Sequence, residues 1–186
     1  VPKKKPDVPE KPKEKSLQEK IKEDFPNVNV GTSAGGEFGL SASKDMDFKS
    51  TMRKSESSDN YMVVNKEGYM GAFQFGDARL QDYKTANKEE FTNQEFLNNK
   101  DLQEKVFDWH VGDIVKYIQD NNLDEAIGKK VNGVVITLNG LVAAAHLGGK
   151  FGMRQYVESG FDKKFNKEDS NGTSLFDYIQ RFQLTK

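Results

Sequence analysis

Glu56 ends a helical pattern and is followed by an aromatic, glycine-punctuated segment. Tyr61 and Asn65 come first, and residues 67–76 then read Glu-Gly-Tyr-Met-Gly-Ala-Phe-Gln-Phe-Gly. A carboxyl group in a partly apolar cleft has a raised pKa, because burial penalises its ionised form. Such a group can protonate the bridging oxygen of a glycosidic bond. We therefore predict that Glu56 is the general acid of a sugar-cleaving site.

The glycine-punctuated segment contains residue types that suit a sugar-binding groove. Gly71 and its neighbouring glycines permit tight turns and close approach of a ligand. Gln74 can donate and accept hydrogen bonds, which suits sugar hydroxyl and acetamido groups. Tyr69, Phe73 and Phe75 can stack on pyranose rings, but aromatic side chains also fill cores. The sequence leaves both roles open for these three rings.

Other chemistries lack the residues that they need. Cysteine is absent, which excludes disulfides, thiolate metal sites and cysteine nucleophiles. The two histidines, His110 and His146, have no neighbouring pattern of zinc ligands. His110 follows Trp109 in a helical pattern and is interpreted as structural. Residues 171–173 match a glycosylation sequon, but Asn-Gly favours a turn. No metal or cofactor is expected.

A mainly helical domain is predicted to position these residues. Apolar residues recur at helical period from Leu102 to Ile118, which predicts a long central helix. A helix capped by Ser43 or Asp45 is predicted to end near Glu56, and alternation over 69–75 predicts a small β-hairpin beside the groove. Further helices are predicted from Asp77, after the capping box Thr92–Glu95, from Thr137 to a stop at Gly148-Gly149, over 152–157, and after the cap Ser174.

Residues 1–40 differ in composition from the rest of the chain. The first fifteen are mostly Pro, Lys and Glu, which predicts an extended linker. Residues 16–19 form a capping box for a short amphipathic helix that ends at Pro26, and residues 31–36 read as a glycine-rich joint. Residues 41–186 are predicted to form the catalytic domain. No signal peptide is visible, and a chain that starts at Val1 suggests processing from a longer one.

The overall composition excludes two classes of partner. The 28 Lys and Arg nearly balance the 29 Asp and Glu, so the chain lacks the basic character of a nucleic-acid-binding protein. No apolar run approaches the ~20 residues that a membrane span requires. We expect neither nucleic acid nor a membrane span among its partners.

Three motifs resemble, in order and spacing, the soluble lytic transglycosylase and goose-type lysozyme superfamily. They are Glu56-Ser57 with Tyr61, the segment 71–75, and the segment 144–149 (Ala-Ala-His-Leu-Gly-Gly). The closer resemblance is to the phage-type branch, with its Glu-Ser-Ser-x-x-Tyr, Asn-x-x-Gly-Tyr-x-Gly-x-x-Gln-Phe-Gly and Ala-Ala-His-Leu-Gly-Gly signatures. It spans roughly Lys49 to Phe182.

This resemblance implies an α+β lysozyme-like fold and cleavage of the MurNAc–GlcNAc backbone of peptidoglycan. Glu56 would act first as the acid and then as the base, which gives a 1,6-anhydro product without metal or cofactor. Ser57 would support its orientation. The residues that would line the glycan groove are Ser57, Tyr61, Asn65, Tyr69, Met70, Gly71, Phe73, Gln74, Phe75 and His146.

Departures from the family pattern leave alternatives open. Ala72-Phe73 stands where Leu-Met is usual, and His146-Leu147 stands where Tyr-Asn is usual. His146 could replace the tyrosine as a hydrogen-bonding group near Glu56, or be satisfied by helix packing. A lysozyme-type hydrolase would need a second carboxylate as base, for which Asp59 and Glu67 are candidates. A structural or glycan-binding component with weakened turnover is the third alternative.

The resemblance also implies partners and a place of action. The substrate would be peptidoglycan glycan strands. Residues 1–40 would connect the domain to other proteins of a virion or an envelope machine. The protein would then be virion-associated and act in the bacterial periplasm and cell wall.

Overall fold

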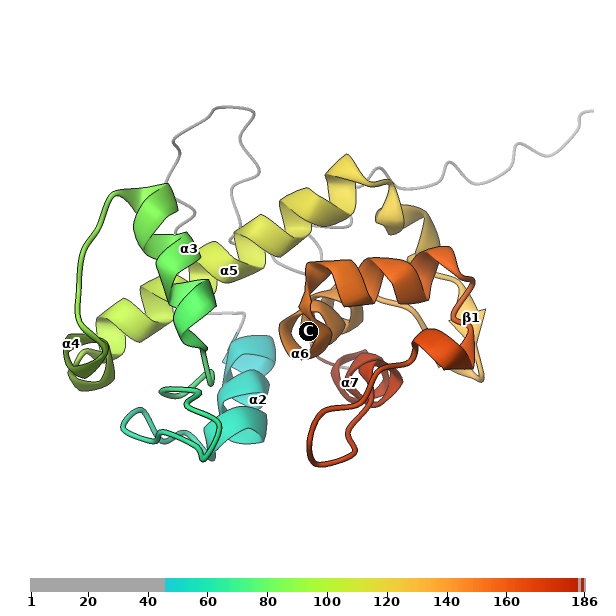
Figure 1. Cartoon of the computed structure of the whole chain (residues 1–186). Helices are drawn as coiled ribbons and strands as arrows, with labels where there is room; N and C mark the ends of the chain where they lie inside the picture. The colour runs from blue at the N-terminus through green and yellow to red at the C-terminus, as the bar shows by residue number, and fades with distance from the viewer. Residues whose placement is uncertain (1–45, 184, 186) are drawn as a thin grey trace, which may run out of the picture.

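The computed structural model describes residues 46–183 and 185. The predicted linker, its short helix, the glycine-rich joint and the caps Ser43 and Asp45 lie outside the described residues. The described part is mainly helical, as predicted, and its longest helices are α5 (Lys100–Asp120) and α6 (Leu138–Glu158) (Figure 1). None of the described helices is both long enough and apolar enough to cross a membrane.

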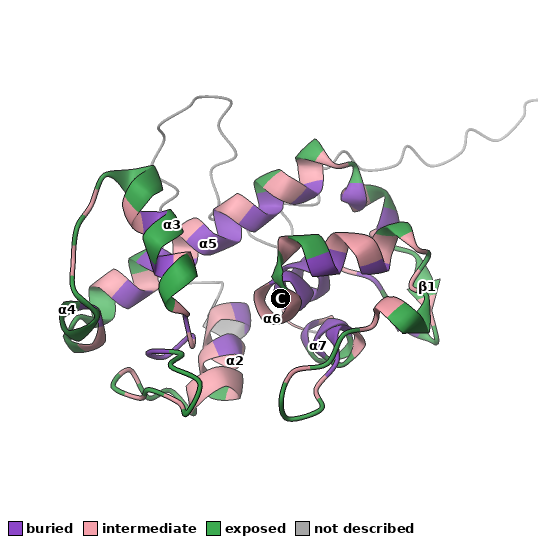
Figure 2. Cartoon of the chain, in the orientation of Figure 1, coloured by how far each residue is buried: buried purple, intermediate pink, exposed green. Residues whose placement is uncertain are grey.

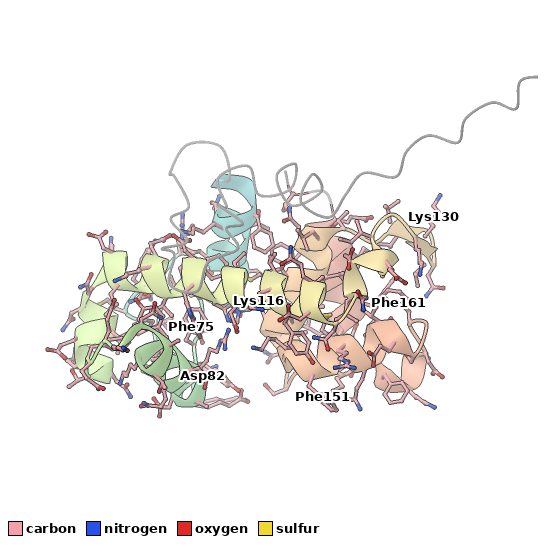
Figure 3. The ribbon with its side chains drawn as sticks, turned by 90° about the horizontal axis from the view of Figure 1, so that it is seen from above. Phe75, Asp82, Lys116, Lys130, Phe151 and Phe161 are labelled. Carbon is pink, nitrogen blue, oxygen red and sulfur yellow. The ribbon has the colours of Figure 1, made fainter. Side chains whose placement is uncertain are left out.

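Helix α5 is the central element, as the periodic apolar pattern predicts. It begins after Asn99, whose side chain accepts a hydrogen bond from the Leu102 N–H. It runs along the length of the described part, with α3 (Asp77–Asn87) and α4 (Asn93–Asn98) near one end and α6 near the other (Figures 1 and 3). Its buried face therefore carries one continuous core, seen as the buried stripe in Figure 2.

Helix α2 (Met46–Ser57) lies between these two groups of helices (Figure 1). Phe48 and Met52 on its inner face are buried, and the Phe48 ring lies 5.4 Å from that of Phe182 and 6.3 Å from that of Phe107. The helix ends where the sequence predicts, so Glu56 lies on its last turn. This packing anchors the helix end that carries the predicted acid.

Helices α6 and α7 (Leu175–Phe182) pack closely because α6 presents glycines to α7. A Cβ on Gly140 would lie 3.2 Å from the Ile179 carbonyl oxygen, and one on Gly148 would lie 2.4 Å from Leu175 Cδ2. Gly149 interrupts α6 with φ 75° and ψ 159°, at the stop that the sequence predicts.

The helix caps agree with the sequence in three of four cases. The Thr92 capping box forms as predicted, and Ser174 caps α7 as predicted, in a capping box with Asp177. The Thr137 side chain caps α6 by accepting from the Gly140 N–H. At α3 the cap is Gly76, and Asp77 is the first helical residue.

The small sheet lies away from the predicted position. Strands β1 (Lys130–Val131) and β2 (Val134–Val135) pair antiparallel, between the short 3₁₀ helices η1 (Leu123–Ala126) and η2 (Lys163–Phe165) in the chain. In the segment where the sequence predicts a hairpin, Met70 makes only single bridges to Val64 and Phe75. No ladder extends there because Gly71 and Gln74 both have positive φ and turn the chain. The predicted hairpin beside the groove is therefore replaced by a turn-rich loop.

Candidate active site

Glu56 faces a polar groove with a volume of about 480 Å³. Its side chain is 14% exposed, so the carboxylate lies in the wall of the groove rather than in bulk solvent. The groove is bounded by the end of α2, the loop after it, the start of the α6 kink, and the segment that leads into α7. Its lining residues are Ser55, Glu56, Asn65, Glu67, Tyr69, Gln74, His146, Leu147, Asp169, Ser170, Asn171, Thr173, Tyr178 and Arg181.

Two hydrogen-bonding side chains lie close to the same oxygen of Glu56. Tyr178 Oη donates to Glu56 Oε1 at 2.5 Å, and His146 Nε2 lies 4.0 Å from that oxygen. Burial raises the pKa of Tyr178, and the nearby Glu56 charge raises it further, so the phenol keeps its proton. Burial lowers the pKa of His146, although Glu56 and the Phe73 backbone act in the opposite direction. The two groups nearest to Oε1 are therefore a protonated phenol and an imidazole whose neutral form is favoured by burial.

His146 is hydrogen-bonded from behind by the other histidine of the chain. His110 Nε2 and His146 Nδ1 are 3.0 Å apart, and Arg79 Nε donates to His110 Nδ1 at 2.8 Å. Burial lowers the pKa of His110 strongly, and the nearby His146 and Arg79 lower it further. The sequence assigns His110 a structural role, whereas the fold connects it to Glu56 through His146. No sequence signal links these residues, because they come from α3, α5 and α6.

The loop after α2 is held by hydrogen bonds of its own predicted site residues. Ser57 Oγ donates to the Ala72 carbonyl at 3.0 Å and so ties the end of α2 to the loop. Asn65 Oδ1 accepts from the Glu67 and Tyr69 N–H groups, both at 2.9 Å. Ser57 does not line the groove, whereas Asn65 and Tyr69 do. Ser57 therefore supports the loop and lies outside the groove lining.

Gln74 and Tyr69 are the loop side chains that face the groove as predicted. Gln74 Nε2 donates to the Gly71 carbonyl at 2.9 Å, so the amide is held in the loop through its nitrogen. Tyr69 is 44% exposed and presents its ring at the groove edge. These two side chains offer a hydrogen-bonding group and an aromatic face to a sugar.

Besides Ser57 and Gly71, four of the predicted groove residues lie outside the groove lining. Phe73 is fully buried and stacks on Phe107 with ring centroids 4.0 Å apart, and Met70 and Phe75 are also buried in the core. The place in the groove that the resemblance implies for the two phenylalanines is corrected to the core, the other role that the sequence leaves open, because their faces pack against other side chains. Tyr61 donates to Glu104 Oε1 at 2.5 Å and does not line the groove.

Gln103 is a buried residue of α5 that holds the loop after α2, a role that no sequence pattern indicates. Its Oε1 accepts from the Ala72 N–H at 2.8 Å, and its Nε2 donates to the Tyr61 and Phe96 carbonyls at 2.9 and 3.0 Å. Gly71 lies against it: a Cβ there would be 2.3 Å from Gln103 Oε1, and its φ is 76°. The glycine thus permits close approach of α5 and is not available to a ligand.

The segment before α7 supplies a wall of the groove that the sequence analysis also misses. Asp169 Oδ1 accepts from the Asn171 and Thr173 N–H groups at 2.9 and 2.8 Å. Gly172 has φ 79°, so the turn predicted for residues 171–173 is confirmed. Tyr178, 122 residues from Glu56 in the chain, follows on α7. The capping box after this turn indicates where α7 begins, but it does not indicate that Tyr178 on α7 contacts Glu56.

Three carboxylates are candidate bases for hydrolysis: Asp59 and Glu67 from the sequence, and Asp169 from the groove lining. Glu67 and Asp169 line the groove with Glu56. Asp59 does not line it and pairs with Arg53, with Nε and Oδ1 3.0 Å apart. Among residues 46–183 and 185, no group of three or more His, Cys, Asp or Glu could hold a metal ion. A hydrolytic base, if one operates, would come from Glu67 or Asp169.

Known proteins provide no family assignment. Comparisons of the chain with protein-family models, with curated proteins and with solved structures find no match.

The folded protein is expected to lose stability as the pH falls from 7 to 5. The unfolded chain binds protons at its histidines near pH 6.5, whereas burial lowers the pKa of both His110 and His146 in the fold. The unfolded state then binds more protons, so the free energy of unfolding decreases as the pH falls. An imidazole that stays neutral throughout this range contributes a loss of about 2 kcal/mol. Urea unfolding at pH 7, 6 and 5 measures the slope.

The matched variant for this measurement is His110→Gln, which keeps an amide donor but removes one titrating group. Its slope should be shallower than that of the wild type. The difference between the two slopes isolates the imidazole from Asp108, whose pKa burial raises to about 6 and whose contribution has the opposite sign. Equal slopes would show that His110 protonates normally in the fold.

Proposed function

We propose that this protein cleaves the MurNAc–GlcNAc backbone of bacterial peptidoglycan as a lytic transglycosylase, with Glu56 as its single catalytic residue. The observation that carries the proposal is the position of Glu56 in the wall of a polar groove, with neutral donors on its carboxylate. The motif resemblance to the lytic transglycosylase and goose-type lysozyme superfamily supports the same assignment, as does the mainly helical fold around a central helix.

The proposed reaction uses one carboxyl group twice. Protonated Glu56 gives its proton to the glycosidic oxygen as the bond from C1 of MurNAc to that oxygen breaks. The C6 hydroxyl oxygen of the same MurNAc then bonds to C1, and its proton returns to the Glu56 carboxylate. The products are a 1,6-anhydro-MurNAc end and a free GlcNAc hydroxyl, and no water is consumed. Tyr178 Oη, as a donor to Glu56 Oε1, would stabilise the carboxylate between these two steps.

The lining of the groove suits a polymer of amino sugars. Asn65, Gln74 and Thr173 offer amide and hydroxyl groups for sugar hydroxyls and acetamido groups, and Tyr69 offers a ring face. Arg181, whose Nη1 donates to Ser55 Oγ at 2.5 Å, is a cation at the same edge. It would favour the lactyl and peptide carboxylates that distinguish MurNAc from GlcNAc.

A lysozyme-type hydrolase is the second candidate, because Glu67 and Asp169 line the same groove. Either carboxylate could activate a water molecule against C1, in an inverting arrangement, or act as a nucleophile in a retaining one. The product would then be a reducing MurNAc end.

Mass spectrometry of the soluble products from purified peptidoglycan tests the proposal. Anhydro-MurNAc ends are expected, because no water enters the product. They are lighter than reducing ends by about one water mass. Reducing ends would replace the transglycosylase route with hydrolysis. Binding to peptidoglycan without any released product would favour a glycan-binding component.

The proposed place of action rests on the motif resemblance and on the composition of residues 1–15. We infer that the enzyme is associated with a phage particle and acts in the bacterial periplasm and cell wall. The Pro-, Lys- and Glu-rich residues 1–15 have the composition of a spacer, which suits attachment of the domain to a larger assembly.

A further inference from the structure

A second pocket lies behind the histidine pair, on the side away from Glu56. It has a volume of about 260 Å³ and includes Arg79, Asp82, His110 and Lys150 among its lining residues. Asp82 of α3 and Phe151, next to Lys150 on α6, lie on the same side of α5 when the molecule is viewed from above (Figure 3). His146 and Gln74 line both this rear pocket and the groove, so these two side chains lie between them.

The hydrogen bonds that start in the rear pocket have a fixed direction. A guanidinium group has only donors and keeps its proton in proteins. His110 Nδ1, which bonds to Arg79 Nε at 2.8 Å, must therefore be the acceptor. A neutral imidazole that accepts at Nδ1 carries its hydrogen on Nε2, so His110 donates to His146 Nδ1 at 3.0 Å. By the same rule His146 carries its hydrogen on Nε2, the nitrogen 4.0 Å from Glu56 Oε1.

Arg79 itself is held firmly in place. Its Nη2 pairs with Asp113 Oδ2, and Lys150 Nζ lies 2.8 Å from the same oxygen. Its guanidinium carbon lies 4.3 Å from the centre of the Trp109 ring. These contacts fix the plane of the guanidinium and so the direction of the Nε–H bond towards His110. A fixed donor of this kind imposes one tautomer on the imidazole in front of it.

We propose that Arg79 is a positioning residue for Glu56: through His110 it sets the tautomer of His146, with the hydrogen on Nε2, the nitrogen that lies 4.0 Å from Oε1 of the catalytic carboxylate. This inference rests on the proposed function. An imidazolium 4.0 Å from Glu56 would favour the carboxylate and so remove the proton that the first step needs. A neutral imidazole with its hydrogen on Nδ1 would instead turn a lone pair towards the carboxylate after proton transfer. Only the neutral Nε2–H form serves both steps.

The chain of donors does not act as a proton relay. A relay from the rear pocket would require its outer member to release and regain a proton, and Arg79 keeps its proton throughout. Every helix around the histidine pair carries a charged or titratable group. These groups are Glu56 on α2, Arg79 on α3, Asp113 on α5, Lys150 on α6, and Tyr178 on α7, which contacts Glu56. Arg79 is the one of them that donates directly to the pair in the described residues.

The experiment compares wild type, Arg79→Met and Arg79→Lys by ¹⁵N NMR of the imidazoles and by the pH dependence of kcat on peptidoglycan. The chain has only two histidines, so the ring nitrogens can be assigned without ambiguity. In the wild type, His146 should show a bare Nδ1 and a protonated Nε2. In Arg79→Met these shifts should move towards averaged values, and His146 should protonate at higher pH. The acid limb of the rate profile should move with it, and kcat should fall about tenfold with KM unchanged, since Arg79 does not line the groove.

Arg154→Met is the matched control, since it removes a cation of α6 that pairs with Glu158 and does not contact the histidines. It should leave the imidazole shifts and kcat at wild-type values, and Arg79→Lys, which keeps a cationic donor, should recover part of both. Unchanged His146 shifts in folded Arg79→Met would overturn the positioning role. So would an Arg79→Lys variant that is as impaired as Arg79→Met. The NMR result does not depend on turnover, so an inactive wild type would reject the proposed function separately.

Discussion

Replacement of Glu56 by glutamine is expected to reduce the rate of peptidoglycan cleavage by about 10²–10⁴-fold, the usual contribution of a general acid–base group. The amide has nearly the same shape but cannot donate a proton to the glycosidic oxygen or take one from the C6 hydroxyl. Tyr178 Oη can still donate to the side-chain oxygen at this position, so the groove should keep its form. Clearing of a peptidoglycan suspension measures the rate, and an unchanged thermal unfolding midpoint verifies the fold.

Glu67→Gln and Asp169→Asn are the matched controls, since both remove a carboxylate from the same groove. For a transglycosylase, each should change the rate far less than Glu56→Gln, because neither group moves a proton. A loss as large as that of Glu56→Gln in one of them would identify a second catalytic carboxylate and favour hydrolysis. Wild-type activity in Glu56→Gln would remove Glu56 from the mechanism.

Replacement of Gln103 by methionine is expected to lower the free energy of unfolding by about 3 kcal/mol. Methionine has a similar size but leaves the buried Ala72 N–H and the Tyr61 and Phe96 carbonyls without the partner that Gln103 supplies. Each buried polar group that loses its partner destabilises the fold by about 1–3 kcal/mol. Urea unfolding followed by circular dichroism measures the change.

Gln81→Met is the control, since it makes the same substitution at an exposed position of α3. It should change the free energy of unfolding by less than about 0.5 kcal/mol. Gln103→Met should also weaken cleavage, because Gln103 bonds the loop that carries Asn65, Tyr69 and Gln74 to α5, next to the Tyr61–Glu104 hydrogen bond. Equal stability of the two variants would show that this loop is held by other contacts.

Much of the helical framework can be predicted from the sequence because its signals are local. Apolar periodicity predicts α5, and the side chains of Thr92 and Ser174 mark where α4 and α7 begin. The break at Gly149 follows from the glycine pair in the same way. Over residues 69–75 the chain forms isolated antiparallel bridges at Met70 rather than a hairpin ladder, because the alternation reflects burial of Met70, Phe73 and Phe75 in a turn-rich loop.

The features of the candidate site also fall into two groups, those set by local sequence and those set by tertiary contacts. The sequence by itself determines Glu56, its place at the end of α2 and its aromatic loop. These features depend on neighbours only a few residues away. Only the tertiary structure decides that Tyr178 donates to Glu56, that His110 bonds to His146, and that Phe73 belongs to the core. These contacts join residues tens of positions apart, and they depend on how closely α6 and α7 approach α2 and α5. That approach is a sum of many packing contacts, which no local pattern encodes.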